Sequence, residues 1–279
     1  MSCSLDHRFL ASAIDIVLHA GEIQLSRFGS ALRIDKKGTI DLVTEADLEV
    51  EAMFRRTIAE RFPSHDVLAE ESGGTHPAGP PATASSSHCW VFDPIDGTTN
   101  FAHGLPIFCS ALALEIDGVV SVAAVYDPTR RELFTAERGG GAYVNGNRLR
   151  TSSTLHLVDA ALVTGFPYDV HERAGEIVEL FGAFVARARA VRRLGSAALD
   201  LCYVASGRLD GFWEEGLRPW DVAAASLVVS EAGGRVSGLD GAPFRARGGH
   251  VLATNGLIHE QMLTVVASVR AVRARNRTE

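Results

Sequence analysis

The chain has 279 residues, of which 46% are hydrophobic and 22% charged, so it can bury a large core and disorder is not expected. Its 27 basic and 34 acidic residues give a net charge of −7, which argues against a general nucleic-acid binder. We expect neither a leader segment nor a membrane-spanning run of eighteen apolar residues. The sequence therefore predicts a cytoplasmic protein that does not enter a membrane.

Two helices are predicted in the first quarter of the chain. Apolar residues recur at helical spacing from Leu10 to Phe28, which indicates an amphipathic helix. A second helix is predicted from Leu48 to Phe62. The Thr-Glu-Ala-Asp sequence at 44–47 matches a capping box ahead of it, so Asp47 has a structural interpretation as well as a functional one.

Two predicted strands end in acidic residues. The first, at 66–69, is followed by Glu70. The stretch 73–87 is rich in Gly, Pro, Ala and Ser and predicts a flexible surface loop. The second strand, at 89–92, would deliver Asp93 at its carboxyl end, where α/β folds commonly place their chemistry.

The residues after Asp93 indicate a site for metal and phosphate. Pro94 fixes φ and is expected to end the strand, so that the chain can return Asp96 toward Asp93 and leave the carbonyl of Ile95 free. Gly97 permits a sharp bend, and the hydroxyl-rich residues that follow favour a helix start, whose N–H groups suit a phosphate oxygen. The alternative is that Asp96 and Gly97 form an ordinary surface turn.

The remaining elements are predicted from apolar periodicity. Short apolar runs broken by turn residues from Ile107 to Val144 indicate meandering strands. Helical spacing predicts three further helices, at 177–185, 198–205 and 258–269. An apolar run at 222–232 predicts another helix, with an acidic residue directly before it.

The functional interpretation depends on four acidic residues taken as a set. They are Glu70, Asp93, Asp96 and Asp221. Asp221 taken alone is best explained as the cap of the helix that follows it. If all four converge, each pair about 4 Å apart repels by about 4 kcal/mol at an effective dielectric of about 20, a large part of the ~5–15 kcal/mol that stabilises a domain. Such a cluster requires cations, and oxygen ligands favour Mg²⁺ or Mn²⁺ over Zn²⁺.

These motifs resemble, in the same order, those of the inositol monophosphatase family of Mg²⁺-dependent, lithium-sensitive phosphatases. The sequences DPIDGTTNF at 93–101 and WDVAA at 220–224 are the most specific, with weaker support from 41–47 and 70–72. The resemblance covers most of the chain. It implies a mixed α-β fold, the layered αβαβα sandwich of the inositol monophosphatase and fructose-1,6-bisphosphatase type.

The resemblance also implies a division into two lobes and a homodimer. An N-terminal lobe, residues 1–150, would carry most metal ligands. A C-terminal lobe, residues 151–279, would contribute Asp221 and the substrate wall. Two or three Mg²⁺ ions are implied, with Mn²⁺ as a possible substitute. The implied metal-binding residues are Glu70, Asp93, Ile95 through its carbonyl, Asp96 and Asp221.

Catalytic and substrate-binding roles follow from the same resemblance. Thr98 with Asp47, or alternatively Glu70, would orient and deprotonate the attacking water. The residues implied to contact the substrate are Asp96, Gly97, Thr98, Gly195, Ser196, Ala197, Glu214 and Asp221.

The expected function is hydrolysis of a small phosphate monoester by a metal-activated water, with inositol monophosphate as the leading substrate. The alternative keeps this chemistry for fructose 1,6-bisphosphate, histidinol phosphate or a nucleotide phosphate, because the metal motif does not select the leaving group. An alternative of another class is a noncatalytic regulator that binds a protein or RNA partner. An aspartyl nucleophile of the haloacid dehalogenase type is disfavoured, since that motif separates its carboxylates by one residue and this one by Pro94 and Ile95.

The sequence assigns no function to three of its features. Lys36 and Lys37 lie where relatives have a basic mobile loop. The basic residues near the C-terminus are explained as a solvated helix end. The cysteines show no paired metal spacing and predict reduced, mostly buried thiols. The cysteines are Cys3, Cys89, Cys109 and Cys202, and the arginines are Arg270, Arg273, Arg275 and Arg277.

Overall fold

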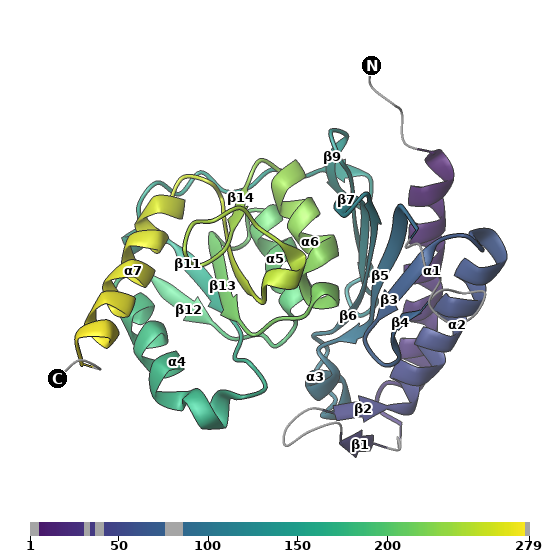
Figure 1. Cartoon of the computed structure of the whole chain (residues 1–279), viewed down its shortest axis with the longest axis horizontal. Coiled ribbons are helices and arrows are strands. Elements are labelled where there is room, and N and C mark those ends of the chain that lie inside the picture. The colour runs from purple at the N-terminus through teal and green to yellow at the C-terminus, as the bar shows by residue number, and fades with distance from the viewer. Residues whose placement is uncertain (1–5, 31–33, 37–41, 76–85, 277–279) are drawn as a thin grey trace.

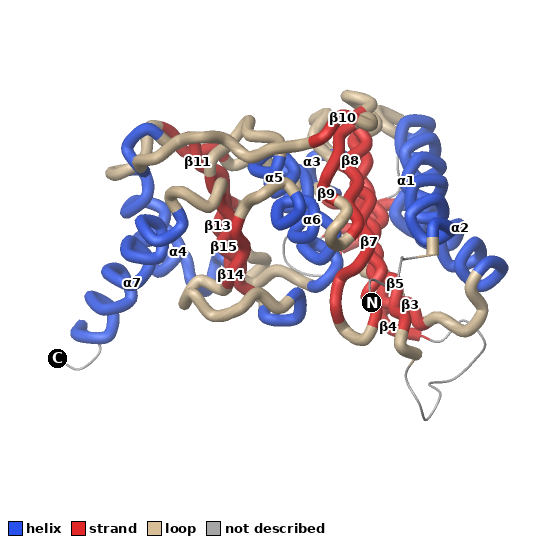
Figure 2. The backbone as a smooth tube through the Cα atoms, turned by 90° about the horizontal axis from the view of Figure 1, so that it is seen from above, coloured by secondary structure: helices blue, strands red, loops and turns tan. Residues whose placement is uncertain are grey.

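Helices and sheets alternate in five layers (Figure 1). The computed structural model describes residues 6–30, 34–36, 42–75 and 86–276. Helices α1 and α2 form one outer layer, α4 and α7 form the other, and α5 and α6 lie between the two sheets, as the view from above also shows (Figure 2). The predicted αβαβα sandwich is confirmed. Residues discussed above that lie outside the described ranges are Cys3, Lys37, Asp41, Arg277 and most of the predicted loop at 73–87.

The outer layer beside the larger sheet consists of α1 (His7–Arg27) and α2 (Glu45–Arg61), close to the two predicted helices. The buried positions of α1 recur every three or four residues and pack with α2 and the sheet in one apolar cluster. α1 has the length and mean hydropathy of a membrane-crossing helix, but its apolar stripe packs on the sheet like that of an ordinary core helix. Thr44 and Asp47 form the predicted capping box of α2.

The larger sheet has eight strands in the order β10-β9-β8-β7-β6-β5-β3-β4, in which only the β3 and β5 neighbours are parallel. Leu112 and Leu114 of β6 face α1 and α2, whereas Ala111 and Ala113 face the middle helices. The strands are β3 (Asp66–Ala69), β4 (Gly73–Thr75), β5 (His88–Asp96), β6 (Cys109–Ile116), β7 (Val119–Asp127), β8 (Glu132–Glu137), β9 (Gly141–Val144) and β10 (Asn147–Arg148).

Two boundaries differ from the sequence prediction. β5 does not end at Pro94 but continues to Asp96, with a shift of register against β6 after Asp93. The Pro94 carbonyl accepts hydrogen bonds from the Gln24 amide (2.7 Å) and the Ser110 hydroxyl (2.8 Å), which hold this irregular backbone beside the sheet. The prediction of a loop from residue 73 onward was also wrong at its start, because β4 pairs with β3 there.

The smaller sheet has five strands in the order β12-β11-β13-β15-β14, with α4 (Val170–Val185) and α7 (His259–Asn276) packed against it. α5 (Ala197–Ala205) and α6 (Pro219–Glu231) are buried almost all round because they lie between the sheets. All three helices predicted at 177–185, 198–205 and 258–269 are confirmed. The strands are β11 (Ala161–Thr164), β12 (Ala190–Arg192), β13 (Gly211–Glu215), β14 (Arg235–Ser237) and β15 (His250–Thr254).

Smaller elements complete the fold. The strands β1 (Ile34–Lys36) and β2 (Leu42–Thr44) form a separate pair near α3 (Thr98–Ala102), and Lys36 is exposed at the end of β1. The expected lobe boundary near residue 150 falls between the two sheets, although one apolar cluster spans both. In α7, Arg273 pairs with Glu179 (2.7 Å), so this helix end is held to α4 as well as solvated.

Candidate active site

Asp93 lies in the irregular part of β5 and is only 2% exposed. Its Oδ1 has no hydrogen-bond partner within the described ranges. Burial, followed by the carboxylates of Glu70, Asp96, Asp221 and Asp47, raises the pKa of Asp93 well above its usual value. A buried carboxyl oxygen without a partner is costly, so this position calls for a cation or a proton.

Glu70 follows β3, and the parallel pairing of β3 with β5 brings it beside Asp93. Glu51 of α2 anchors the turn, because its carboxylate accepts hydrogen bonds from the backbone N–H groups of the two residues after Glu70 (2.8 and 3.2 Å). The Arg55 guanidinium pairs with Glu51 in turn (2.9 Å). Glu51 was missed by the sequence analysis, since its place on a helix gave no sign that it holds a neighbouring turn.

Asp96 ends β5 and points at the amino end of α5. Its carboxylate accepts hydrogen bonds from the Ser196 hydroxyl (2.5 Å) and from the backbone N–H groups of Ala197 (3.2 Å) and Ala198 (2.7 Å). Burial raises the pKa of Asp96, and these hydrogen bonds partly oppose that rise. Asp96 therefore joins the end of β5 to the start of α5, a role that the sequence did not predict.

Asp221 approaches the same cluster from the first turn of α6. One of its oxygens accepts a hydrogen bond from the backbone N–H of Arg218 (2.7 Å), so the capping interaction considered for it is present. Burial raises the pKa of Asp221 well above its usual value, and the nearby carboxylates of Asp96 and Glu70 add to the rise. Capping and membership of the acidic cluster are thus compatible.

Thr98 begins α3 directly after Gly97, whose φ of 97° is accessible chiefly to glycine. The Thr98 hydroxyl donates to the carbonyl of Ile95 (2.9 Å), and Asp47 Oδ1 lies 3.4 Å away as a second acceptor. The expectation that the Ile95 carbonyl is left free was therefore wrong. Asp47 also accepts hydrogen bonds from the N–H (2.8 Å) and hydroxyl (2.6 Å) of Thr44, so it both caps α2 and borders Thr98.

The acidic side chains form one electrostatic cluster without forming a closed cage of ligands. In the part of the chain that the structure describes, no three Asp, Glu, His or Cys side chains approach closely enough to enclose a metal ion. Both oxygens of Asp96 face α5, and one oxygen of Asp221 faces a backbone N–H. The donor set still fits a hard divalent cation, because it consists of mutually repelling oxygens and includes the unpartnered Asp93 Oδ1.

A cavity opens beside the cluster, with walls from both lobes. All of the residues expected to contact a substrate line it, and they come from the end of β5, from α3, from the start of α5, from β13 and from α6. These residues are Asp96, Gly97, Thr98, Gly195, Ser196, Ala197, Glu214 and Asp221. The structure thus brings the two separated halves of the predicted site to one place.

Comparison with known proteins identifies the family. The model of the inositol monophosphatase family matches residues 6–271. The chain belongs to the inositol monophosphatase family. An inositol-1-monophosphatase of Synechocystis sp. is 43% identical over 261 residues, which cover 93% of this chain and 89% of that protein. The Nus factor SuhB of Escherichia coli K12 is 42% identical over 259 residues, which cover 92% of this chain and 95% of that protein.

A solved structure agrees with the inositol monophosphatase assignment. The inositol monophosphatase from Anabaena (Nostoc) sp. PCC 7120 superposes with a TM-score of 0.84 at 39% sequence identity. The match covers 94% of this chain and 96% of that chain. Fold and family therefore rest on both sequence and structure.

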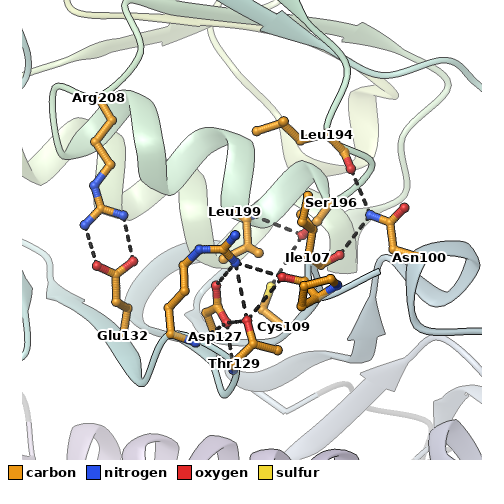
Figure 3. A network of polar contacts seen from close by, with 12 residues as sticks. Asn100, Ile107, Cys109, Asp127, Thr129, Glu132, Leu194, Ser196, Leu199 and Arg208 are labelled. Atoms are coloured by element: carbon orange, nitrogen blue, oxygen red, sulfur yellow. Dashed lines mark hydrogen bonds and ion pairs between the residues drawn. The ribbon is translucent and has the colours of Figure 1, made fainter. Parts of the chain in front are cut away.

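Asn100 of α3 is a further residue near the site to which no role was assigned from the sequence. Its side-chain amide donates to the carbonyls of Ile107 (2.9 Å) and Leu194 (2.8 Å), as Figure 3 shows. Leu194 directly precedes the cavity wall at 195–197. Asn100 therefore ties α3 to the wall contributed by the C-terminal lobe.

Two charged residues of the cavity wall, Arg193 and Asp200, were also missed. Asp200 lies in the first turn of α5, where an acidic residue usually needs no explanation beyond the helix dipole. Arg193 precedes α5 in a segment that gave no periodic signal. Only the folded structure shows that both border Glu214.

The described cysteines are free thiols, as predicted. Cys109 and Cys202 are fully buried, and burial raises the pKa of both thiols well above the usual value. Cys109 Sγ lies 3.8 Å from Asp96 Oδ2, so it contributes a weak contact to the acidic cluster.

Gly165 in the cavity wall leaves room for the Glu214 carboxyl, which a Cβ at this position would overlap. We predict that Gly165→Ala displaces the end of this flexible side chain, lowers kcat/KM for hydrolysis of a phosphate monoester about 10-fold and leaves the melting temperature unchanged or slightly raised. Steady-state kinetics and thermal melts check this. A large fall in melting temperature would show instead that the position is needed for folding.

Proposed function

We propose that this protein is a Mg²⁺-dependent phosphatase that hydrolyses a small phosphate monoester, with inositol monophosphate as the leading substrate. The observation that carries the proposal is the buried, unpartnered Asp93 Oδ1, which lies among Glu70, Asp96 and Asp221 beside a cavity lined by both lobes. A structural scaffold has no use for a carboxylate cluster of this kind, because its mutual repulsion costs folding free energy.

The cluster supplies the oxygen ligands for the cations. Glu70, Asp93 and the Ile95 carbonyl would hold one Mg²⁺, and Asp93, Asp96 and Asp221 would hold a second. Mg²⁺ neutralises phosphate charge and stabilises the attacking and leaving oxygens when it is bound. Asp96 would keep its hydrogen bonds to α5 while presenting remaining lone pairs, since a carboxylate has about four such sites.

Thr98 and Asp47 are placed to orient the attacking water. The single hydroxyl proton of Thr98 is used toward the Ile95 carbonyl (2.9 Å), with Asp47 Oδ1 nearby at 3.4 Å, which leaves the hydroxyl oxygen free to accept from water. In one route the Thr98 hydroxyl would turn from the Ile95 carbonyl to Asp47, give its proton to that carboxylate and take a proton from the water in exchange. In the other route the water would give its proton directly to Glu70. Neither route requires a covalent intermediate on Asp93.

One part of the cavity wall would select the leaving group. Glu214 is 7% exposed and lines the cavity together with Gly195, Ser196 and Ala197 at the start of α5. These residues suit hydroxyl groups, which supports inositol monophosphate ahead of histidinol phosphate, whose leaving group has no other hydroxyl. Fructose 1,6-bisphosphate and a nucleotide phosphate also carry hydroxyl groups and stay alternatives.

Phosphate release with and without Mg²⁺ tests the proposal. The purified protein should release phosphate from inositol monophosphate in the presence of Mg²⁺, lose this activity in EDTA and regain it when excess Mg²⁺ is added. Lithium should inhibit the reaction. The same assay across sugar, histidinol and nucleotide phosphates, read as kcat/KM, ranks the substrates. If no ester of the panel is hydrolysed, the phosphatase proposal is wrong.

The relatives named Nus factor SuhB favour a second candidate function, a regulatory role exerted through a protein or RNA partner. This role does not need the acidic cluster, so it would survive substitution of Asp93, whereas phosphate release would not. The homodimer implied by the family stays a prediction, to be checked by light scattering of the purified protein.

A further inference from the structure

Asp200 is a buried acidic residue of the cavity wall for which the fold provides no partner. Its side chain is 1% exposed, yet it lines the cavity beside Glu214. Its Oδ1 has no hydrogen-bond partner within the described ranges. Buried polar atoms are nearly always hydrogen-bonded in folded proteins, so an unpartnered carboxyl oxygen on a residue that lines a cavity points to a ligand group.

Asp200 is not explained as a helix cap. The amino end of α5 is already satisfied by the Ser196 hydroxyl, which accepts from the N–H of Leu199 (3.4 Å), and by the Asp96 carboxylate. The backbone N–H of Asp200 itself bonds to the carbonyl of Ser196 (2.9 Å). The Asp200 side chain therefore does not serve as a cap of α5 and is available to bind a ligand group.

Glu214 faces the same space from a different element. It lies on β13, is 7% exposed, and is close enough to Asp200 for the charge of one carboxyl to raise the pKa of the other. The Arg193 guanidinium opposes that rise at both residues. Two carboxyl groups and one cation from three separate segments thus line the same cavity, near enough to Asp96 for its charge to raise the pKa of both carboxyls.

The chemistry of these groups indicates what they recognise. Burial raises the pKa of Glu214 to about 8, so this carboxyl can carry a proton at neutral pH, and burial raises the pKa of Asp200 as well, while its Oδ1 is left without a partner in the described structure. A protonated carboxyl donates one hydrogen bond and accepts others, as does a hydroxyl group. A second phosphate group carries about −1.5 to −2 charges near neutral pH, so it mainly accepts hydrogen bonds and is repelled by nearby carboxylates. Adjacent hydroxyl groups of a polyol are neutral and both donate and accept hydrogen bonds.

We propose that Asp200 is a specificity-determining residue that, together with Glu214, hydrogen-bonds two hydroxyl groups of a polyol leaving group. The inference rests on the proposed phosphatase function and deepens it, because it assigns a second hydroxyl-binding residue and requires a leaving group with at least two hydroxyls on one side. A leaving group without hydroxyls gains nothing from Asp200.

Two variants of Asp200 and two substrates test this proposal. Leucine has a shape similar to that of aspartate but cannot form the hydrogen bond. Asp200→Leu should therefore lower kcat/KM for inositol monophosphate by about 10- to 100-fold. The same variant should change kcat/KM for phenyl phosphate by less than about threefold. Asp200→Asn keeps a donor and an acceptor and should restore most of the activity on inositol monophosphate. Asp117→Asn, in the exposed turn between β6 and β7, is the control.

Each outcome is decisive. Equal losses on both substrates in Asp200→Leu would show a structural role and overturn the assignment, as would an unchanged value for inositol monophosphate. Failure of the unsubstituted protein to hydrolyse any ester of the panel with Mg²⁺ would overturn the proposed function, and with it this inference. Hydrolysis of panel esters without inositol monophosphate or another polyol phosphate among them would overturn this inference alone. A selective loss rescued by asparagine supports both.

Discussion

Replacing Asp93 by asparagine should lower kcat for phosphate release by about 10³-fold or more without destabilising the metal-free protein. The substitution removes a carboxyl group that is fully buried, lies among four other carboxylates and has one oxygen without a partner. Asparagine needs neither a cation nor a proton at this position, so the melting temperature of the EDTA-treated protein should stay equal or rise. Kinetics with excess Mg²⁺ and thermal melts in EDTA measure the two effects.

Asp127 offers a matched control because it is also buried but fully partnered. Its carboxylate accepts hydrogen bonds from the backbone N–H groups of Thr129 (2.9 Å) and Arg130 (3.0 Å), and pairs with the Arg130 guanidinium (2.9 Å), in the network drawn in Figure 3. Asp127→Asn should lower the free energy of unfolding by about 1–3 kcal/mol and retain kcat. The two buried aspartates should therefore respond in opposite ways. A loss of stability in Asp93→Asn, with activity preserved, would contradict the assignment of Asp93.

The periodic elements and the acidic motif could be predicted from the sequence because their signals are local. The apolar stripe of α1 and the helices at 177–185, 198–205 and 258–269 follow directly from the spacing of residues that the core buries. The strand ends at Glu70 and Asp93 were found because apolar runs stop there. Convergence with Asp221 required the family resemblance, since nothing local connects residues so far apart.

What could not be predicted depends on partners distant in the chain. The continuation of β5 past Pro94 relies on Gln24, which lies 70 positions earlier and donates to the Pro94 carbonyl. The available signal for this contact was Gln24 itself, a polar residue on the mostly apolar buried face of α1. The importance of Asp200 arises in the same way, because its sequence position suggests only a helix dipole effect and its burial beside Glu214 exists only in the folded protein.

The pH dependence of stability should change when Glu214 is replaced by glutamine. Burial raises the pKa of Glu214 to about 8, an effect that Arg193 partly opposes, whereas a glutamate in the unfolded chain titrates near about 4.3. Between these values the folded protein holds a proton that the unfolded chain has lost. The stability contributed by the neutral carboxyl is therefore complete below about pH 4 and is lost as the pH rises to about 8, by about 1.4 kcal/mol per pH unit.

Glutamine cannot ionise, so Glu214→Gln should gain in free energy of unfolding relative to the unsubstituted protein as the pH rises, by about 4 kcal/mol between pH 5 and 8. Urea unfolding of the EDTA-treated proteins at several pH values measures this difference, and Glu60→Gln on the exposed face of α2 controls for the loss of one carboxyl. Parallel stability curves for Glu214→Gln and the unsubstituted protein would mean that Glu214 is ionised at neutral pH. In that case its carboxylate would only accept hydrogen bonds, and a leaving group carrying a positive charge would fit the cavity better than a neutral polyol.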